Sequence, residues 1–417
     1  MTPQTSDVLI LGGGAIGLAC AVYLLDAGRS VTVLEKESAG CAASHGNCGT
    51  LTPSHAVPLA TPDTLRSAIG WLFKADAPLH ITLRPDPELL RWLFGFVGHC
   101  NWKKAARATA VKAPLLRRSR ELIEDLVRVH HLACEFEAVG TLNVYRDAAN
   151  FAHAQSLLAR FSDLGLRVDV LDAAATLARE PALKSGVVGA FFNPGDAQLR
   201  PDRYVAELAR VVRAKGGVIA EHTRIDRIER EGARIAKVAT SNGNFSGREV
   251  VLALGAWSPL FAHQLGLRLP IQPGKGYSIT YTRPTVCPRI PLTLKEPSVC
   301  VTAWESGYRL GSTMEFAGYD TSLNRTRLDA LKRGAAQFLH EPEGPAVVEE
   351  WYGWRPMTPD DLPVLGRAPG VDNLILATGH GMLGVTLSAV TGLLVSEIAT
   401  GRVPSFDLAP LAAARFV

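Results

Sequence analysis

The stretch SDVLILGGGAIGLACAVYLLDAGRSVTVLEK, residues 6–36, decides the fold of this chain. Its apolar run Val8–Leu11 is typical of a buried strand, helical spacing follows as far as Ala27, and Ser30–Leu34 is typical of a second strand. Between the first strand and the helix, residues 12–17 match the pattern G-x-G-x-x-G. A strand, a glycine turn, a helix and a second strand in this order predict a βαβ unit that binds a dinucleotide.

Each part of this unit has a physical task. Gly12 permits the tight turn, Gly14 lets the backbone approach a pyrophosphate, and Gly17 lets the helix pack closely on the strand. The N–H groups and the positive dipole end of the helix favour phosphates. Glu35 ends the second strand, where a carboxylate accepts from a ribose hydroxyl and disfavours the 2′-phosphate of NADP. We therefore expect cofactor contacts from Gly12, Gly14, Ala15, Ile16, Gly17, Glu35 and Lys36; a glycine turn without a ligand is the alternative.

Three further segments favour one long ligand held at several strand ends. A small, polar loop at residues 40–49 follows the second strand, and residues 249–256 (EVVLALGA) read as a buried strand ending at glycine. Residues 373–377 form another such strand, which runs into Thr378–Gly384 (TGHGMLG) and then into an apolar helix. Here we expect contacts from Ser44, His45, Asn47, Gly49, Gly255, Trp257, Gly379, His380, Gly381, Met382, Leu383 and Gly384.

Nearly the whole chain resembles a known group of enzymes. Besides the fingerprint, the resemblance rests on the loop at 43–49, on residues 58–79, on GKGYS at 274–278, on WRPMTPDDLPVLG at 354–366 and on TGHGMLG. These motifs are similar to those of the FAD-dependent D-amino-acid dehydrogenases, within the D-amino-acid oxidase, glycine oxidase and sarcosine oxidase superfamily. The chain departs from the family at His45, at Cys48, where a glycine is usual, and at Met382, where threonine is common.

The predicted fold class is α/β (α+β overall). We expect a Rossmann-like FAD-binding domain made of residues 1–60, 196–268 and 351–417. Residues 61–195, rich in helices, and 269–350, with alternating strands, would form a discontinuous substrate domain on an antiparallel sheet with helices. Helical spacing covers 114–131 and 150–164, and Pro114 suits the first position of its helix.

Arg355 is the leading candidate for a substrate contact. Pro356 restricts it, and a rigid guanidinium can hold a carboxylate through two parallel hydrogen bonds. The residues alone leave a structural salt bridge equally open, whereas the resemblance implies that the arginine of this R-P motif binds the substrate carboxylate. Tyr277, Tyr308 and His55 are the other pocket candidates, each with an ordinary structural role as its alternative.

The resemblance implies hydride transfer from Cα of a D-amino or D-imino acid to flavin N5, with the protein mainly orienting the two. We read His380, between glycines, as a contact rather than a general base. Some superfamily members tether the flavin through His or Cys, but we expect non-covalent FAD beside His45 and Cys48. Residues 45–49 and 194–201 resemble the branch that oxidises cis-4-hydroxy-D-proline and D-proline.

Several alternatives remain open. A broad-specificity D-amino-acid dehydrogenase and a glycine or sarcosine oxidase that uses O₂ would share fold and cofactor. An NAD-dependent dehydrogenase would share the fingerprint, and a non-catalytic flavin module is a further reading. The electron acceptor is unknown, with a quinone or an electron-transfer chain as candidates.

Composition bounds the partners and the location. The 417 residues, 47% hydrophobic, suffice for two domains, and the net charge of +4 is too small to indicate nucleic acid. Seven cysteines without metal-like spacing indicate no metal site and reduced thiols.

We expect a cytoplasmic enzyme without a signal peptide or a transmembrane span. The apolar segment 89–100 reads as a core helix, or else as a patch for peripheral contact with the cytoplasmic face of the inner membrane.

Overall fold

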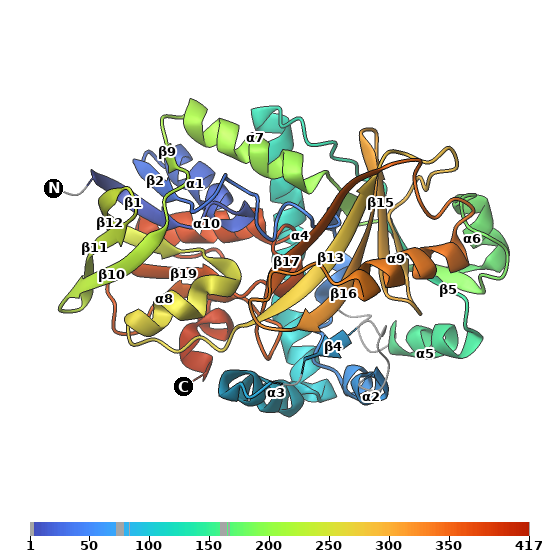
Figure 1. The fold of residues 1–417 in the computed structure, drawn as a ribbon. Helices are drawn as coiled ribbons and strands as arrows, with labels where there is room; N and C mark the ends of the chain where they lie inside the picture. Colours follow the sequence, from blue (N-terminus) through green and yellow to red (C-terminus); the bar gives the residue numbers. More distant parts are fainter. Residues whose placement is uncertain (1–3, 72–78, 83, 159–164, 166, 417) are drawn as a thin grey trace.

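The computed structural model describes residues 4–71, 79–82, 84–158, 165 and 167–416. In this part of the chain two large sheets stand side by side, each with helices against it (Figure 1). Both termini lie near the first sheet (Figure 1). No helix among these residues combines the length and the apolar character needed to cross a bilayer.

The first sheet has the order β10-β11-β12-β1-β2-β9, with β19 beside β12 and β18 beside β19. Its strands are β1 (Gln4–Leu11), β2 (Val31–Leu34), β9 (Val218–Ala220), β10 (Ile225–Glu231), β11 (Arg234–Thr240), β12 (Gly243–Leu252), β18 (Val364–Arg367) and β19 (Leu374–Thr378). β1 pairs in parallel with both β2 and β12, and β12 pairs in parallel with β19. The carboxyl ends of these strands therefore meet at one edge.

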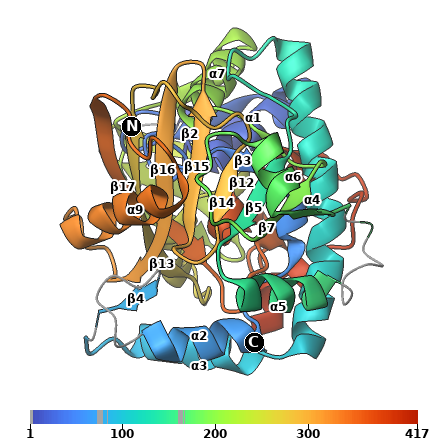
Figure 2. The same cartoon turned by 90° about the vertical axis from the view of Figure 1, so that its right-hand side faces the viewer.

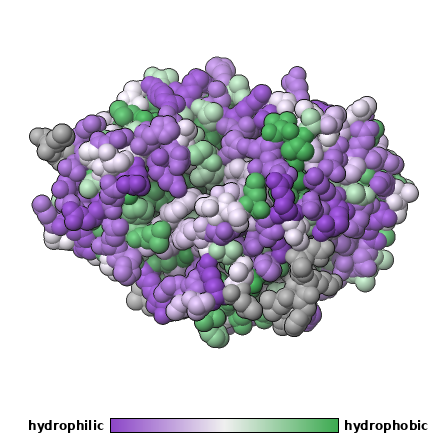
Figure 3. All heavy atoms as spheres, in the orientation of Figure 1, coloured by the Kyte–Doolittle hydropathy of each residue, from purple (hydrophilic) through white to green (hydrophobic). Residues whose placement is uncertain are grey.

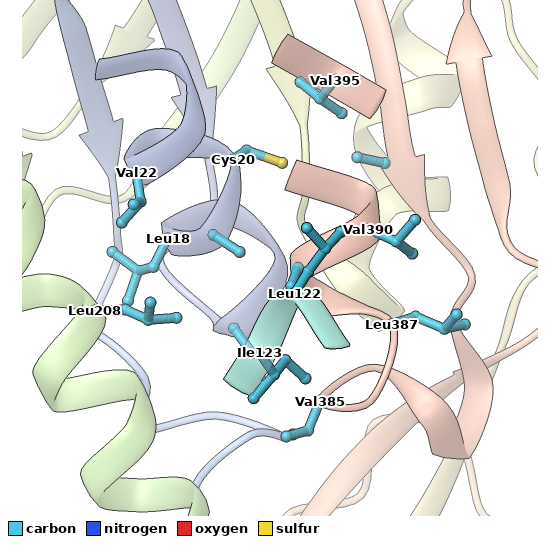
Figure 4. Packing of buried hydrophobic residues seen from close by; sticks show 14 of the residues in the cluster. Leu18, Cys20, Val22, Leu122, Ile123, Leu208, Val385, Leu387, Val390 and Val395 are labelled. Atoms are coloured by element: carbon cyan, nitrogen blue, oxygen red, sulfur yellow. The ribbon is translucent and has the colours of Figure 1, made fainter. Parts of the chain in front are cut away.

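Helices from distant parts of the chain cover this sheet. They are α1 (Ala15–Asp26), α7 (Pro201–Ala214), α8 (Ser258–Gln264) and α10 (Ser388–Ala399), with the short turns η3 (Gly255–Trp257) and η4 (Gly381–Leu383). α1 and α10 pack closely, because a Cβ on Gly392 would lie 2.7 Å from the carbonyl oxygen of Ala19. Figure 4 shows the shared core, in which Leu18 of α1 and Val390 of α10 meet Ile123 of a third helix.

The second sheet has the order β17-β13-β16-β15-β14-β5-β7-β6, with β4 beside β16. Its strands are β4 (Leu79–Ile81), β5 (Thr141–Tyr145), β6 (Asp169–Asp172), β7 (Gly189–Asn193), β13 (Gln272–Tyr281), β14 (Leu292–Leu294), β15 (Val299–Trp304), β16 (Gly307–Phe316) and β17 (Val347–Met357). Most of its pairings are antiparallel. α9 (Arg325–Phe338) packs on one face, with Leu328, Leu331 and Phe338 in the core.

The remaining elements surround these two layers. They are β3 (Thr50–Leu51), β8 (Ala197–Gln198), η1 (Pro53–Ala56), α2 (Pro62–Trp71), α3 (Pro87–His99), α4 (Trp102–His130), α5 (Ala148–Leu158), α6 (Ala173–Arg179), η5 (Ala409–Leu411) and η6 (Ala413–Phe416). The view from the side shows α4 running along the molecule, with α2 and α3 at its lower end (Figure 2).

The predicted start of a helix at Pro114 is wrong. α4 begins at Trp102, where the side chain of Asn101 accepts a hydrogen bond from the N–H of Lys104 (2.9 Å), and Pro114 lies inside the helix. An interior proline costs about 3 kcal/mol. Buried apolar side chains on both sides of it, such as Ala108 before it and Leu116 after it, offset that cost through packing.

The fingerprint is confirmed in its local structure, because α1 ends at Asp26 and β2 ends at Leu34. The mixed α/β class is also confirmed. The division into domains stays a prediction, and its last boundary differs from the strand pattern: β17 pairs with β13 as far as Met357, so Arg355 belongs to the second sheet. Parts of two sequence-based predictions, the motif at 58–79 and the helix at 150–164, lie outside the described residues.

Candidate active site

A cavity of about 900 Å³ is lined by residues of both sheets. Ligand sites in proteins usually measure roughly 300–1,000 Å³, so this cavity is large for an amino acid alone. One side is formed by the carboxyl ends of β1, β2 and β19, and the other by β14 to β17. Loop 42–50 and the helices α2 and α3 complete the lining. The cavity therefore has room for a long cofactor together with a substrate.

The glycines of the fingerprint are confined where the sequence predicts. Gly12 has φ +108°, and a Cβ there would lie 2.5 Å from the carbonyl oxygen of Ala253. A Cβ on Gly17 would lie 1.9 Å from the carbonyl oxygen of Gly12. Close packing of helix on strand thus leaves no space for a larger residue, and Gly14, Ala15 and Ile16 of the turn line the cavity.

Glu35 stands at the rim of the same turn and is buried. Its carboxylate accepts hydrogen bonds from the N–H groups of Gly13 (2.8 Å) and Glu37 (3.1 Å), and it lines the cavity. The ammonium of Lys36 lies 4.3 Å from the ring centroid of Trp257, so both residues frame the cavity beside Glu35. This arrangement suits a ribose hydroxyl, because each carboxylate oxygen can accept more than one hydrogen bond.

Replacing Glu35 with alanine is expected to weaken FAD binding by roughly 1–3 kcal/mol, because a charged hydrogen bond to the ribose is lost. The dissociation constant can be measured by flavin fluorescence during titration of the apoprotein. Glu35→Gln, which keeps one acceptor oxygen, should lose less of the affinity for FAD than the alanine variant. Unchanged affinity in the alanine variant would remove Glu35 from the site.

Loop 42–49 is attached to both halves of the cavity. The Ser44 hydroxyl accepts from the N–H of Ala15 (3.1 Å) at the start of α1, and the Asn47 amide oxygen accepts from the N–H of Gly49 (2.7 Å). The His45 ring instead pairs with Glu349 (2.8 Å). Ser44 and Asn47 line the cavity, whereas His45 and Gly49 do not appear in its lining.

Arg309 is a site residue that the sequence analysis missed. It is fully buried on β16, and its guanidinium donates to the carbonyl oxygens of His45 (2.9 Å) and Asn47 (2.7 Å) and to the hydroxyl of Thr280 (2.9 Å). Burial lowers the pKa of Arg309 from its ordinary value. The second sheet therefore holds the loop of the first through Arg309, in addition to the pair between His45 and Glu349.

The C-terminal loop forms the third wall. Residues 380–385 line the cavity. His380 is buried, its Nε2 lies 3.0 Å from the hydroxyl of Thr391, and burial lowers its pKa to about 3. A ring that is neutral at pH 7 and engaged with threonine fits a contact residue. α10 begins only at Ser388, so the backbone of η4 rather than the end of α10 reaches the cavity. Gly379 lies outside the lining, and a Cβ at this position would lie only 2.8 Å from the methyl group of Thr358.

Arg355 reaches the cavity from β17. Its guanidinium lies over Gly276, where a Cβ would be 2.4 Å away, and donates to the carbonyl oxygens of Thr313 (2.6 Å) and Ser312 (3.5 Å). Among the described residues no carboxylate pairs with it. Burial lowers the pKa of this guanidinium, although Cys48 and Cys300 partly oppose the shift. A half-buried cation on a cavity wall without a carboxylate partner suits an anionic ligand.

The other three pocket candidates lie in different places. The Tyr277 ring borders the cavity, but its hydroxyl donates to the buried Glu315. Tyr308 lies outside the lining, with its hydroxyl on the carbonyl oxygen of Pro342 (3.2 Å). His55 does line the cavity. The structure thus brings Arg355 and His55 to the cavity and takes Tyr308 into the core beneath α9.

The fold and the site define a class: a two-sheet protein in which a Rossmann-type unit and a second sheet enclose one long cavity. Residues 7–398 match the model of the family described as FAD dependent oxidoreductase. This chain therefore belongs to that family, and its cofactor is FAD. The glycine cradle, Glu35 and the cavity volume fit this group. The family match also overturns the alternative of an NAD-dependent enzyme.

Curated relatives and solved structures agree with this assignment. The chain is 35% identical over 416 residues to a D-amino acid dehydrogenase from Paramagnetospirillum magneticum, covering 98% of each chain, and 32% identical to one from Xanthobacter autotrophicus, covering 98% and 99%. A glycine oxidase from Geobacillus kaustophilus shares the fold with a TM-score of 0.81 at 24% identity, covering 99% of this chain and 100% of that one. An L-proline dehydrogenase from P. horikoshii has a TM-score of 0.73 at 20% identity, covering 100% and 98%.

Proposed function

We propose that this enzyme oxidises D-amino or D-imino acids, with D-proline and cis-4-hydroxy-D-proline as preferred substrates. The observation that carries the proposal is Arg355, a guanidinium without a carboxylate partner among the described residues, on the wall of a cavity that also holds the FAD cradle. The curated relatives named D-amino acid dehydrogenase support the substrate class.

The chain's own residues would mainly position the substrate. Arg355 would bind the α-carboxylate, and the carbonyl oxygens of Thr313 and Ser312 keep its guanidinium in place. FAD supplies a two-electron acceptor for the hydride that leaves Cα. His380 is engaged with Thr391 and carries no charge at neutral pH, so no general base is assigned to it. The substrate amine would react in its neutral form, so that its lone pair forms the C=N bond as the hydride leaves. Water would hydrolyse the imine product to a 2-oxo acid and ammonia, whereas a ring substrate would remain as a pyrroline.

We infer that FAD is held without a covalent bond. The His45 ring pairs with Glu349 and is absent from the cavity lining, which argues against a tether there. Cys48 lines the cavity and is the alternative attachment point. Yellow colour that stays with the acid-precipitated protein would overturn this inference.

Anaerobic bleaching of the flavin tests the substrate proposal directly. The panel is D- and L-proline, cis-4-hydroxy-D-proline, D-alanine, glycine and sarcosine. We expect faster bleaching with the two D-imino acids than with D-alanine, and none with L-proline. A kcat/KM for D-alanine well above both ring substrates would favour a broad-specificity D-amino-acid dehydrogenase. Rapid bleaching by glycine or sarcosine, with fast reoxidation by O₂, would favour an oxidase like the structural relatives.

We further propose an electron acceptor other than O₂, reached through peripheral contact with a membrane. α3 exposes Leu90, Phe94 and Val97, which recur at helical spacing on one side, and Phe94 is 77% exposed. Figure 3 shows apolar atoms gathered over α3 at the lower margin. The exposed cations Lys103 and Lys104 follow directly. An apolar stripe beside cations suits an anionic lipid surface.

Replacing Phe94 with serine is expected to reduce sedimentation with anionic vesicles several-fold, because the most exposed apolar side chain of the stripe is removed. Turnover with a water-soluble dye should not change, since Phe94 does not line the cavity. Val403→Ser, at an equally exposed apolar residue far along the chain, is the control. Equal sedimentation of both variants and the wild type would contradict peripheral attachment through α3.

A further inference from the structure

The cavity lining carries a cationic region apart from Arg355. It lies where β14 ends, at Thr293 and Lys295, both of which line the cavity. Thr293 is the middle residue of β14, and Lys295 begins the turn that follows this strand. Lys295 is exposed, and its exposed surface belongs to the cavity lining.

The Lys295 ammonium makes no hydrogen bond or ion pair with the described residues. The adjacent Glu296 does not pair with it, because one Glu296 oxygen accepts from the N–H groups of Arg146 (3.1 Å) and Asp147 (3.0 Å). Desolvation by the surrounding cavity walls lowers the pKa of Lys295, and the charge of Glu296 partly opposes this shift. A hydrogen-bond acceptor on a ligand would stabilise a cation in such surroundings more than one that is fully in water.

His55 of η1 lines the same cavity and lies within reach of the charge of Lys295. Its ring lines the cavity and makes no hydrogen bond within the described part of the chain. Burial, together with the charges of Lys112 and Lys295, lowers its pKa to about 4, so the imidazole is neutral at pH 7. Lys112 is already paired with Asp361 (2.6 Å). Lys295 is therefore the cation near His55 that has no partner among these residues.

The strand order places this region on the same side of the cavity as Arg355. The Arg355 guanidinium donates to carbonyl oxygens of β16, and β15 separates β16 from β14. Neighbouring strands are roughly 4.8 Å apart, so β16 and β14 are about 10 Å apart. Leu294 pairs with Val299 and Val299 with Ser312, so the end of β14 lies opposite the carbonyl groups that hold Arg355. A ligand anchored at Arg355 can therefore extend along this wall toward Lys295.

We propose that Lys295 and His55 form a second anchoring point, which binds an acceptor oxygen that the substrate carries away from its α-carboxylate. The inference rests on the proposed function and narrows its substrate class. A ring hydroxyl and a side-chain carboxylate share the required chemistry: each offers oxygen lone pairs to an ammonium and a neutral imidazole. A cationic side chain is repelled at the same place. Substrates with a distal oxygen are therefore preferred over unsubstituted ones of the same size.

Lys295→Met in the FAD-loaded enzyme tests the proposal. With a dye as acceptor, kcat/KM for cis-4-hydroxy-D-proline should fall at least 10-fold, while that for D-proline stays within about twofold. D-Glutamate, compared with D-norvaline, distinguishes the two oxygen sources. A larger loss of kcat/KM for D-glutamate assigns the region to carboxylates. A larger loss of kcat/KM for cis-4-hydroxy-D-proline assigns it to hydroxyls. Lys295→Gln, which keeps a donor, should recover part of the loss. Lys215→Met, on an exposed lysine at the end of α7, is the control.

Two results would overturn the proposal. An equal loss for D-proline and its hydroxylated form would show that Lys295 acts on the flavin or on the fold rather than on the distal oxygen. Unchanged kcat/KM for every substrate would show that the region is not occupied. Failure of the proposed function looks different, because the wild-type flavin would then be bleached by no D-amino or D-imino acid at all.

Discussion

Replacing Arg355 with lysine is expected to raise the KM for D-amino and D-imino acids by one to two orders of magnitude, with a normal flavin spectrum. Lysine keeps the charge but loses the planar fork that binds a carboxylate through two parallel hydrogen bonds. A lost charged hydrogen bond costs roughly 1.5–3 kcal/mol, which corresponds to this range. Steady-state kinetics with a dye acceptor measures the effect.

Arg325→Lys is the matched control, because Arg325 is an exposed arginine of α9 that pairs with Glu350. It should leave KM unchanged. If the Arg355 variant loses FAD or fails to fold, the main role of Arg355 is structural, through its hydrogen bonds to Thr313 and Ser312. The substrate carboxylate then binds elsewhere. A KM equal to that of the wild type would contradict the carboxylate role outright.

Replacing Arg309 with methionine is expected to weaken FAD binding about 100-fold or more. The change leaves the carbonyl oxygens of His45 and Asn47 without their donor, and each unsatisfied buried group costs roughly 1–3 kcal/mol. Loop 42–49 would lose two of its hydrogen bonds to the second sheet and keep the pair between His45 and Glu349. The FAD dissociation constant gives the loss, and hydrogen exchange of the loop amides shows whether the loop has been released.

Arg283→Met is the comparison, because Arg283 also donates to a backbone carbonyl, that of Trp304, but does not touch the loop. It should keep FAD affinity. If the methionine variant does not fold, Arg309→Lys replaces it in the experiment. The lysine variant should show an intermediate loss of affinity for FAD. An FAD affinity and an exchange rate like those of the wild type would mean that the loop holds its shape without Arg309.

The sequence predicts the cofactor side of the cavity well, because its requirements are local. A tight turn, a close helix contact and a strand-terminal acid must occur at fixed spacing, and Gly12, Gly17 and Glu35 lie as that spacing demands. The family and FAD follow from these motifs and are confirmed by the family match. The individual contacts of these residues with FAD stay predictions.

The substrate side is harder to predict, because its residues meet only through long-range pairing. Tyr277 and Tyr308 resemble pocket residues in sequence, yet the hydroxyl of each has an intramolecular partner. Arg309 belongs to no recognisable sequence motif. The only sign of its role in the sequence is a single charged residue between Tyr308 and Leu310 in a strand. Lys295 reaches the cavity from the turn after β14, and its place there depends on how β14 pairs with β5 and β15. Pro114 shows the same limit, since tertiary packing overrides a local helix signal.

The arrangement of the first sheet has a consequence for synthesis on the ribosome. β1 is made first, but its partner β12 pairs with β19, whose first residue, Leu374, is made roughly 360 residues after Leu11. At about 5–20 residues per second, the nascent chain waits roughly 20–70 s before the sheet can be completed. During that time the edge of β12 that later pairs with β19 stays unpaired. Because residues 380–385 are also the third wall of the cavity, a chain that terminates before them lacks a complete cofactor site, and retention of yellow colour reports that translation has passed this loop.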